Sequence, residues 1–320
     1  MRLSLLLALS LLPGLVLACA SSTRATGGDA GTAADAGVDA GPPARGSVET
    51  FVELETSSEG LAFGGSAAGG PLLYFGGGNA LWSATPSGTI AKVADVPAPL
   101  GIALMKNGDL VVCGKGDGDV GKSEMPGVLW RVSPSGARSV LLGPGAISFK
   151  LTNFVVVSGD GTLVFSDSAG NKVYSAKADG TGVALVTDAI TYPNGMAYSA
   201  DGKTLYVASW NTRKLYSLPR GADGTFGAPE VYFEGVENVD GITVLGSGEL
   251  LLVASGEGVV RVGLDRKKTS VADGSNFKLP ANGAFGGGPF GDRWLYVTNL
   301  LGRHLSRVYI DETGIPLPPM

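Results

Sequence analysis

Short runs of alternating apolar and polar residues recur along the chain, and six of them open with a similar two-residue step. The steps are Glu59-Gly60, Leu100-Gly101, Asn153-Phe154, Asn194-Gly195, Asp240-Gly241 and Asn282-Gly283. Their second residues are separated by 41, 53, 41, 46 and 42 residues along the chain. Such intervals match the length of a β-propeller blade, and alternation with period two indicates β-strands rather than helices. The pattern therefore predicts six repeated β units.

Each repeat continues with the signals of further antiparallel strands. In four repeats a turn glycine follows seven positions after the step, at Gly108, Gly161, Gly202 and Gly248. Glycine supplies the positive φ that a tight hairpin requires. A second and a third apolar strand follow in every repeat, as at residues 205–207 and 215–216 of the fourth. Because no long amphipathic helix is visible after residue 47, the sequence predicts an all-β fold, a six-bladed β-propeller with four-stranded blades.

The two ends of the predicted propeller carry complementary signals for closing the ring. The last repeat runs into Gly314-Ile315-Pro316-Leu317-Pro318-Pro319, where prolines at alternate positions cannot donate hydrogen bonds to a sheet. Residues 48–55, just ahead of the first repeat, read as a strand. We therefore expect residues 48–55 to pair with the third strand of the sixth blade, at residues 305–310, which closes the ring and removes two open sheet edges.

The first residues of the six steps are almost all oxygen donors, namely Glu59, Asn153, Asn194, Asp240 and Asn282. Equivalent positions of propeller blades surround a common axis, so these side chains are expected to form a ring. Asn or Asp before Gly is also ordinary turn chemistry, but Glu59 is poor turn material and the positions keep the register of the blades. A ring of carboxylates and amide carbonyls without sulfur or imidazole is typical of a hard cation such as Ca²⁺.

The N-terminus carries the features of an export signal. Residues 1–18 combine an arginine with an apolar run that is too short to span a membrane comfortably. The run ends at Ala18-Cys19, which resembles the bacterial lipobox, whose cysteine becomes the acylated first residue. Residues 19–47, rich in Gly, Ala, Asp and Pro, predict a disordered tether to a propeller at residues 48–320. The expected location is the bacterial cell envelope, as an extracytoplasmic lipoprotein held to the bilayer through Cys19. A secreted or periplasmic soluble protein is the alternative.

Composition narrows the range of functions. The formal net charge is −5 and the only dense basic run, residues 266–268, lies in a predicted turn, so nothing indicates nucleic-acid binding. His304 is the only histidine and no Gly-x-Ser-x-Gly motif is present, which leaves no material for a serine triad or a two-histidine site. If Cys19 carries lipid, Cys113 has no disulfide partner and is expected to be a small buried group. We expect a monomer.

Several motifs together resemble a known family. They are Glu59-Gly60-Leu61-Ala62-Phe63, Tyr192-Pro193-Asn194-Gly195-Met196, Val239-Asp240-Gly241 and Ala284-Phe285-Gly286-Gly287. Over about residues 57–318 the chain resembles the gluconolactonase, regucalcin and luciferin-regenerating-enzyme-like β-propellers, also called senescence marker protein-like. The resemblance implies the same six-bladed fold that the repeats predict.

The resemblance also implies a site and an activity. In that family one divalent cation sits in the central channel on a Glu, two Asn and an Asp, which correspond here to Glu59, Asn153, Asn194 and Asp240. Ca²⁺ is the expected ion, with Mg²⁺, Mn²⁺ and Zn²⁺ as alternatives, and Asn282 is expected nearby as an indirect ligand. The implied reaction is hydrolysis of a lactone or ester, in which the cation polarises the carbonyl and Asp240 orients or deprotonates the attacking water.

Two positions depart from the family pattern. Its sugar lactonases usually carry Arg two residues before the first Asn and Asp directly after it, and here Leu151 and Phe154 occupy these places. Both are apolar, so we expect a small-molecule lactone or ester that is less polar than a sugar lactone. The alternative is a surface-tethered propeller that binds a ligand or a protein without chemistry. An enzyme requires an open cation site beside a cleft, whereas a scaffold can fill its channel with side chains.

Overall fold

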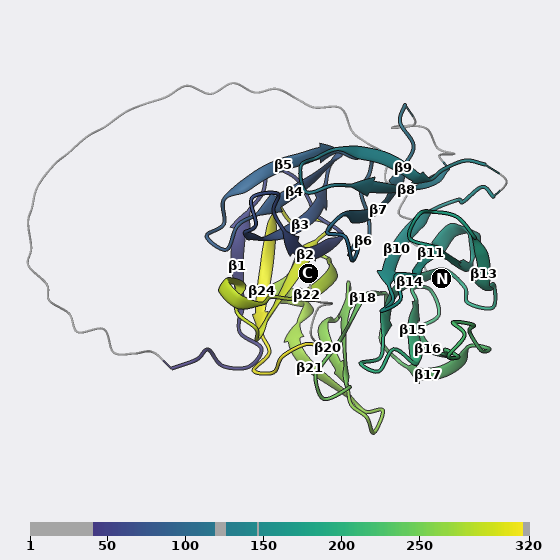
Figure 1. The fold of residues 1–320 in the computed structure, drawn as a ribbon. Coiled ribbons are helices and arrows are strands. Elements are labelled where there is room, and N and C mark those ends of the chain that lie inside the picture. The colour runs from purple at the N-terminus through teal and green to yellow at the C-terminus, as the bar shows by residue number, and fades with distance from the viewer. Residues whose placement is uncertain (1–40, 119–125, 146, 316–320) are drawn as a thin grey trace, which may run out of the picture. The chain divides into compact units, whose positions relative to one another are not determined.

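A computed structural model describes residues 41–118, 126–145 and 147–315. Within the described residues, the chain from Ala44 onward forms one compact unit. This unit contains all the strands of the described residues and is drawn in Figure 1. None of the helices in the described part is long and apolar enough to cross a membrane.

The N-terminal expectations fall mostly outside the described residues. The signal segment 1–18, the acylation site Cys19 and the tether as far as residue 40 are not among them. Directly ahead of the first strand, Gly46 N donates a hydrogen bond to Tyr309 O at 2.8 Å. The chain therefore contacts the last blade a little before the point where the first strand begins.

Six four-stranded antiparallel sheets form the compact unit, and they follow one another around Figure 1. Blade 1 is β2 (Leu61–Gly65), β3 (Pro71–Gly77), β4 (Ala80–Ala84) and β5 (Ile90–Asp95), and blade 2 is β6 (Ile102–Leu104), β7 (Leu110–Lys115), β8 (Gly127–Val132) and β9 (Arg138–Leu142). Blade 3 is β10 (Thr152–Val157), β11 (Leu163–Asp167), β12 (Lys172–Ala176) and β13 (Ala184–Thr187), and blade 4 is β14 (Pro193–Tyr198), β15 (Thr204–Ser209), β16 (Lys214–Pro219) and β17 (Glu230–Glu234).

Blade 5 is β18 (Val239–Val244), β19 (Leu250–Ala254), β20 (Gly258–Val262) and β21 (Lys268–Asp273), and blade 6 is β22 (Pro280–Phe285), β23 (Trp294–Asn299), β24 (His304–Tyr309) and β1 (Val48–Glu53). Three short 3-10 helices, η1 (Ser168–Gly170), η2 (Gly274–Asn276) and η3 (Gly288–Phe290), occupy loops of the described part. The first strands of successive blades contact one another around the axis. The prediction of an all-β, six-bladed propeller with four-stranded blades is confirmed.

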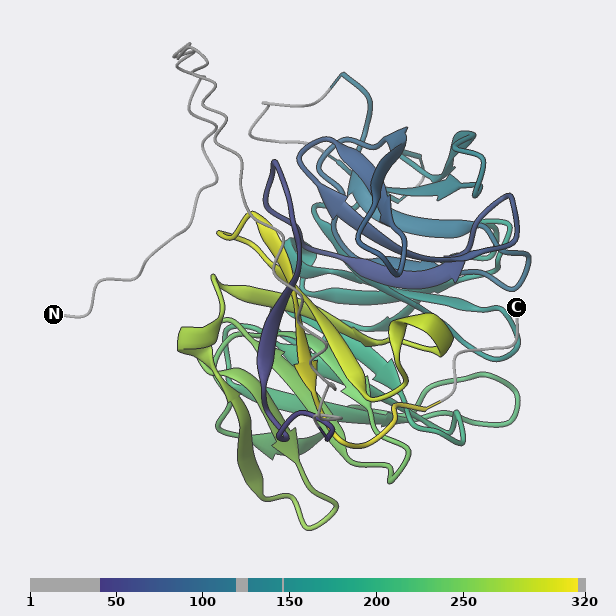
Figure 2. The same ribbon diagram turned by 90° about the vertical axis from the view of Figure 1, so that its left-hand side faces the viewer.

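The ring closes as the sequence predicts, through a strand from the N-terminal end. β1 pairs with β24 in antiparallel register, for example Val48 with Val308, and Figure 2 shows the two strands side by side. Pairing ends with a hydrogen bond from Leu54 N to Arg303 O at 2.7 Å. Residues 54–58 then leave the sheet edge and lead to the axis, so the strand is shorter than the predicted 48–55. The closure removes an exposed edge that another chain could pair with.

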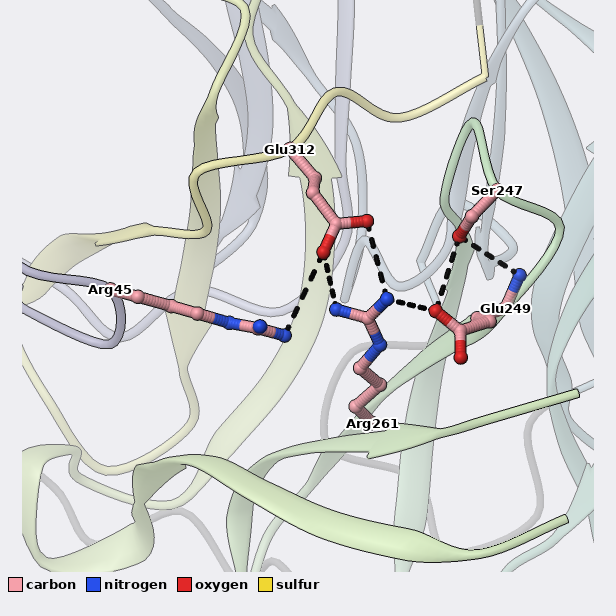
Figure 3. A network of polar contacts seen from close by, with 5 residues as sticks. All are labelled: Arg45, Ser247, Glu249, Arg261 and Glu312. Atoms are coloured by element: carbon pink, nitrogen blue, oxygen red, sulfur yellow. Dashed lines mark hydrogen bonds and ion pairs between the residues drawn. The ribbon is translucent and has the colours of Figure 1, made fainter. Parts of the chain in front are cut away.

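A polar network on blade 5 reinforces this closure by tying down both ends of the described chain (Figure 3). The guanidinium of Arg261 on β20 binds the carboxylates of Glu249 and Glu312, with Nη2 at 3.2 Å from Glu312 Oε2. Arg45, just ahead of β1, lies 3.8 Å from Glu312 Oε1. The segment after β24 also bridges to the residue that follows β18. Because the side chain of Arg261 is only 16% exposed, solvent screens these ion pairs less than fully exposed ones.

The core of the propeller is divided among the six interfaces between neighbouring blades. Each interface contains one apolar cluster. Successive residues of β19 belong to different clusters, with Leu250 and Leu252 facing blade 4 and Leu251 and Val253 facing blade 6. A strand buried on both faces is apolar at every position, because successive side chains point to opposite sides. The continuous apolar runs of the second strands follow from this arrangement.

Candidate functional site

Four of the predicted ring residues lie in β-bulges of the innermost strands. The pairing register shifts between Thr152 and Val155 in β10, Pro193 and Met196 in β14, Val239 and Gly241 in β18, and Pro280 and Gly283 in β22. These shifts fall at Asn153, Asn194, Asp240 and Asn282. A bulge bends its strand and changes the direction of a side chain, and bulges are over-represented beside active sites. Glu59 instead lies just before β2, where its N–H donates to Gly76 O at 3.2 Å.

The second residues of the steps explain how the blades meet at the axis. At four of the glycines among them, an added Cβ would lie too close to a backbone carbonyl oxygen of the next blade. The distances would be 1.9 Å from a Cβ on Gly60 to Leu100 O, 2.6 Å from Gly101 to Asn153 O, 2.0 Å from Gly195 to Asp240 O and 3.0 Å from Gly241 to Ala281 O. None of these four glycines has a positive φ. They are therefore glycine because the backbone of the next blade occupies the place of a side chain. The contacts bring the ring residues of successive blades next to one another.

Hydroxyl groups at the ends of the second strands also join neighbouring blades at the axis. Ser168 Oγ donates to Pro193 O at 2.5 Å, and Ser255 Oγ donates to Pro280 O at 3.1 Å. Thr298 Oγ1 donates to the carbonyl oxygen of Glu59. Each bond runs from one blade to the start of the next, at a ring residue or within two residues of one. Sequence analysis missed these groups, although a Ser or Thr at the end of the second strand recurs in the repeats and was a usable signal.

Burial sets the electrostatics of the ring. Asp240 is 2% exposed and Asn194 3%, and neither Asp240 Oδ1 nor Asn194 Oδ1 has a hydrogen-bond partner among the described residues. Desolvation raises the pKa of Asp240 to about 7, although a hydrogen bond from the Asn194 side chain opposes the shift. Burial, and then the charge of Asp240, raises the pKa of Glu59 well above its ordinary value. The carboxyl groups of Glu59 and Asp240 are therefore close enough to interact electrostatically.

This donor set suits a hard cation rather than a soft one. A buried acceptor without a donor costs free energy, and two facing carboxylates repel each other, so a bound cation would relieve both penalties. Within the described ranges no three His, Cys, Asp and Glu side chains cluster, because most ring donors are amides. Asn153 and Asn282 are also buried, at 7% and 5% exposure. The residues present fit an ion that prefers carboxylate and carbonyl oxygens.

Tyr192 is a further residue at the ring that sequence analysis did not assign. Its backbone has φ of 45°, uncommon for a bulky residue. Its N–H donates to Asn171 Oδ1 at 2.8 Å, which holds the connection in place. Burial, and then the charges of Glu59 and Asp240, raise the pKa of the phenol. The phenol of Tyr192 is therefore within electrostatic reach of both carboxylates and keeps its proton at neutral pH.

The other residues that the sequence singled out lie in different surroundings. Leu151 is half-buried in the connection to β10, where its N–H donates to Asp167 Oδ1 at 2.7 Å. Phe154 is also half-buried and packs against the cluster between blades 3 and 4. His304 pairs with Glu53 in the β24–β1 ladder, far from the innermost strands. Cys113 is a fully buried free thiol, but it lies beside the ring step of blade 2, where its N–H donates to Gly101 O at 2.8 Å.

Comparisons with known proteins agree with this arrangement. Residues 76–300 match the family described as SMP-30/Gluconolactonase/LRE-like region. A gluconolactonase structure from Xanthomonas campestris aligns with a TM-score of 0.67 and 22% identity, over 82% of this chain and 89% of that one. A luciferin-regenerating enzyme aligns with a TM-score of 0.67 and 17% identity, over 86% and 99%. The calcium-binding protein regucalcin from Agrobacterium tumefaciens aligns with a TM-score of 0.65 and 18% identity, over 84% and 98%. At these identities the likeness shows the fold. No curated protein matches the chain.

Proposed function

Since the chain belongs to the SMP-30/gluconolactonase/LRE-like family, we propose that it is a calcium-dependent lactonase-type hydrolase. The single cation is held by Glu59, Asn153, Asn194 and Asp240, with Asn282 as an indirect ligand. The observation that carries the proposal is a pair of buried oxygens, Asn194 Oδ1 and Asp240 Oδ1, for which the described residues provide no hydrogen-bond partner. Relatives named gluconolactonase and calcium-binding regucalcin support the activity and the choice of ion.

The charge of the donor set is consistent with Ca²⁺. Two carboxylates balance a divalent cation, and the two amide carbonyls add neutral oxygens. Ca²⁺ takes about 6 to 8 oxygens, so four side chains leave positions for water and substrate. Mg²⁺ prefers a stricter octahedral shell and Zn²⁺ prefers nitrogen and sulfur, which makes both weaker candidates for amide-rich surroundings.

The reaction follows from the placement of Asp240. A Ca²⁺ ion held by the ring residues would supply a Lewis acid for the carbonyl oxygen of a lactone or ester. Asp240, buried and held by Asn194, orients the attacking water and accepts its proton. Burial and both carboxylates raise the pKa of Tyr192, so its phenol keeps its proton and is the proposed hydrogen-bond donor to an oxygen of the substrate. The product is the open hydroxy acid, or an acid and an alcohol.

The experiment that tests the proposal measures binding and turnover separately. Calorimetry should detect Ca²⁺ binding to the wild type at close to one site per chain. A panel of lactones, aryl esters and phosphotriesters should show hydrolysis of the carboxylic substrates that EDTA removes and Ca²⁺ restores. Asp240→Asn should keep part of the metal affinity and lower kcat, because the amide cannot accept a proton. Asp201→Asn, at an exposed hairpin turn, is the matched control and should change neither quantity.

Two results would contradict the proposal in different ways. Absence of Ca²⁺ binding to the wild type removes the metal site altogether. Binding of Ca²⁺ without hydrolysis of any substrate leaves the alternative, a tethered propeller that binds a ligand or a protein. The second result is distinguishable from a misfolded preparation because the calorimetric stoichiometry is preserved.

The substrate is proposed to be less polar than a sugar lactone. Neither Leu151 nor Phe154 offers a group that could bind substrate hydroxyls, and Phe154 packs into an interface between blades. The ratio of kcat/KM for an alkyl-substituted γ-lactone over glucono-δ-lactone should therefore exceed one. Leu151→Arg should lower this ratio, since it restores a hydrogen-bond donor for hydroxyls. A wild type that prefers the sugar lactone would contradict this part of the proposal.

The cellular location is a separate proposal that rests on sequence alone. We propose that Cys19 is the acylated first residue of a lipoprotein in the bacterial cell envelope. Mass spectrometry of the mature N-terminus should find a lipidated cysteine, and Cys19→Ser should release the protein from the membrane fraction. A mature chain that begins elsewhere would leave simple secretion.

A further inference from the structure

A cleft of about 470 Å³ lies where the closing strand β1 meets blade 1. Its floor is apolar and is formed by Leu54, Phe75, Trp82 and Ile90. Its rim carries the polar residues Glu53, Glu55 and Thr56. None of the ring residues lines it, so the cleft is separate from the proposed cation site. Its volume falls in the range of clefts that hold small molecules.

The cleft exists because the chain leaves the sheet edge at this point. After Leu54 the backbone stops pairing with blade 6 and crosses to blade 1. A Cβ on Gly77 would lie 2.9 Å from both Ser57 O and Thr56 Cγ2, so the crossing segment rests directly on β3. Trp82 Nε1 donates to Gly77 O at 3.1 Å, which fixes the plane of the indole. The walls are therefore positioned before any ligand arrives, which lowers the entropic cost of binding.

The two charged residues that line the cleft, Glu53 and Glu55, are both acidic. Glu53 and Glu55 are exposed, and within the described residues neither carboxylate forms an ion pair. No basic side chain lines the cleft. Lys92, on the strand paired with that of Trp82, is held by Asp95 at 2.5 Å. The rim is thus an uncompensated pair of negative charges above an aromatic and aliphatic floor.

We propose that this cleft binds a small organic cation with an aromatic or alkyl body, such as a quaternary ammonium compound. An aromatic face with nearby carboxylates attracts an onium group through the ring quadrupole and the opposite charge. The apolar body replaces water on the floor formed by Leu54 and Ile90. A neutral ligand would gain only the second contribution, and an anion would meet repulsion from Glu53 and Glu55. The proposal does not depend on the calcium site or on hydrolysis.

The test compares three probes of similar size, benzyltrimethylammonium, benzyl alcohol and phenylacetate. The full chain labelled with ¹⁵N-tryptophan is titrated in EDTA, and the Trp82 indole signal is assigned by its loss in Trp82→Phe. Benzyltrimethylammonium should shift this signal saturably at millimolar concentration, and benzyl alcohol should bind at least threefold more weakly. Phenylacetate should leave the signal unchanged. Added NaCl should weaken binding of the cation, because the rim charges are exposed.

Substitutions of Glu53 and Glu55 separate the contribution of the rim charges to ligand affinity from that of the apolar floor. Glu53→Gln with Glu55→Gln should weaken benzyltrimethylammonium binding by roughly 3- to 20-fold, as expected for two exposed charge contacts. The affinity for benzyl alcohol should stay the same in this variant. Glu230→Gln, which removes an exposed carboxylate on the outer strand of blade 4, is the matched control and should leave binding unchanged. Equal melting temperatures exclude unfolding as a cause.

Three outcomes would overturn the proposal. Equal affinities for the three probes would make the cleft an apolar site without preference for cations. An unshifted Trp82 signal at millimolar cation would show that the cleft takes no such ligand. Displacement of the organic cation by Ca²⁺ at equal concentration in the absence of EDTA would assign Glu53 and Glu55 to a metal ion instead.

Discussion

The two ends of an innermost strand carry nearly the same dipeptide for opposite physical reasons. β14 has Asn194-Gly195 at its axial end and Asp201-Gly202 in the hairpin after its other end. Gly202 has φ of +68° and an added Cβ would meet nothing within 4 Å. Gly195 has no positive φ, but its Cβ would lie 2.0 Å from Asp240 O. The turn needs glycine for its backbone conformation, whereas the axis needs it for the approach of the next blade.

The aspartates of the hairpin and of the axis, Asp201 and Asp240, differ in whether the carboxylate Oδ1 atom is hydrogen-bonded. In the hairpin, Asp201 Oδ1 accepts hydrogen bonds from Ser199 Oγ at 2.6 Å and Lys203 N at 3.1 Å. At the axis, Asp240 Oδ1 is buried and has no hydrogen-bond partner in the part of the chain that the structure describes. A turn that satisfies its own polar atoms is a structural element, while a buried group left unsatisfied in a native fold calls for an explanation. The contrast teaches that dipeptide identity alone does not separate a hairpin from a binding site.

Substituting the two glycines of this strand should give the largest difference between its ends. Gly195→Ala places a methyl group on the backbone of blade 5, which no rotamer change can relieve, so we expect a loss of roughly 4 kcal/mol or more in the free energy of unfolding. Loss of Ca²⁺ binding should accompany it, since Asn194 and Asp240 would be pushed apart. Urea unfolding and calorimetry measure the two effects.

Gly202→Ala is the control from the hairpin. It forces alanine into a left-handed conformation, which should cost about 1 to 2 kcal/mol, and Ca²⁺ affinity should stay as in the wild type. Equal destabilisation by the two alanines would contradict the distinction between close approach and turn conformation.

Local signals allowed the fold to be predicted from the sequence. Gly202 and the alternation around it depend only on neighbours in the chain, and the pairing of β1 with β24 follows from the need to close sheet edges. The approach of Gly195 to Asp240 O involves another blade, and the bulge at Asp240 arises from the register of β18 against β19, so the dipeptides alone encode neither. The register of the repeats selected the ring residues, but their burial and unsatisfied oxygens required the structure. The network around Arg261 also joins segments that are distant in sequence.

The next largest expected effect is the change with pH in the free energy of unfolding of the metal-free protein. Burial raises the pKa of Asp240 from its ordinary 3.8 to about 7, so between these values the folded state keeps a proton that the unfolded state has released. The free energy of unfolding in EDTA should therefore fall from about pH 4 to about pH 7, by on the order of a few kcal/mol. The raised pKa of Glu59 acts in the same direction. Asp240→Asn should flatten the slope.

Ca²⁺ provides the control for this pH effect. A cation that binds ionised carboxylates should stabilise the protein more at pH 8 than at pH 5, which reverses the slope seen in EDTA. Thermal melting across this range, with and without Ca²⁺, measures both curves. A metal-free protein that becomes more stable between pH 5 and pH 8 would contradict the burial of uncompensated carboxyl groups at the axis.

A smaller effect, a loss of Ca²⁺ affinity, should separate a ring asparagine, Asn194, from a hairpin asparagine, Asn107. Asn194→Ala removes a proposed ligand whose oxygen has no partner, so Ca²⁺ affinity should fall at least about tenfold. Its free energy of unfolding in EDTA should fall by about 1 kcal/mol, because the hydrogen bond from the Asn194 side chain to Asp240 is lost. Asn107→Ala breaks the contacts of a hairpin asparagine with Asp109, at 2.8 and 3.2 Å, and should cost about 1 kcal/mol without any change in affinity. A fall in affinity for Asn107→Ala would contradict the assignment of the ring.

The smallest expected effect is the contribution of Asp201 to the pH dependence of stability. This contribution rises with pH, whereas that of Asp240 falls. Hydrogen bonds from Ser199 and Lys203 lower the pKa of Asp201, so its contribution to stability is present above its ordinary pKa and is lost as the pH falls through the lowered value. Asp201→Asn should remove part of the acid-side loss of stability and leave the slope between about pH 5 and pH 8 as in the wild type. Thermal melting in EDTA from about pH 2.5 upward measures both regions in one series. If Asp201→Asn changed the slope of stability against pH between about pH 5 and pH 8, that slope could not be assigned to the carboxyl groups at the axis alone. The distinction between the hairpin aspartate and the axial aspartate would then be wrong.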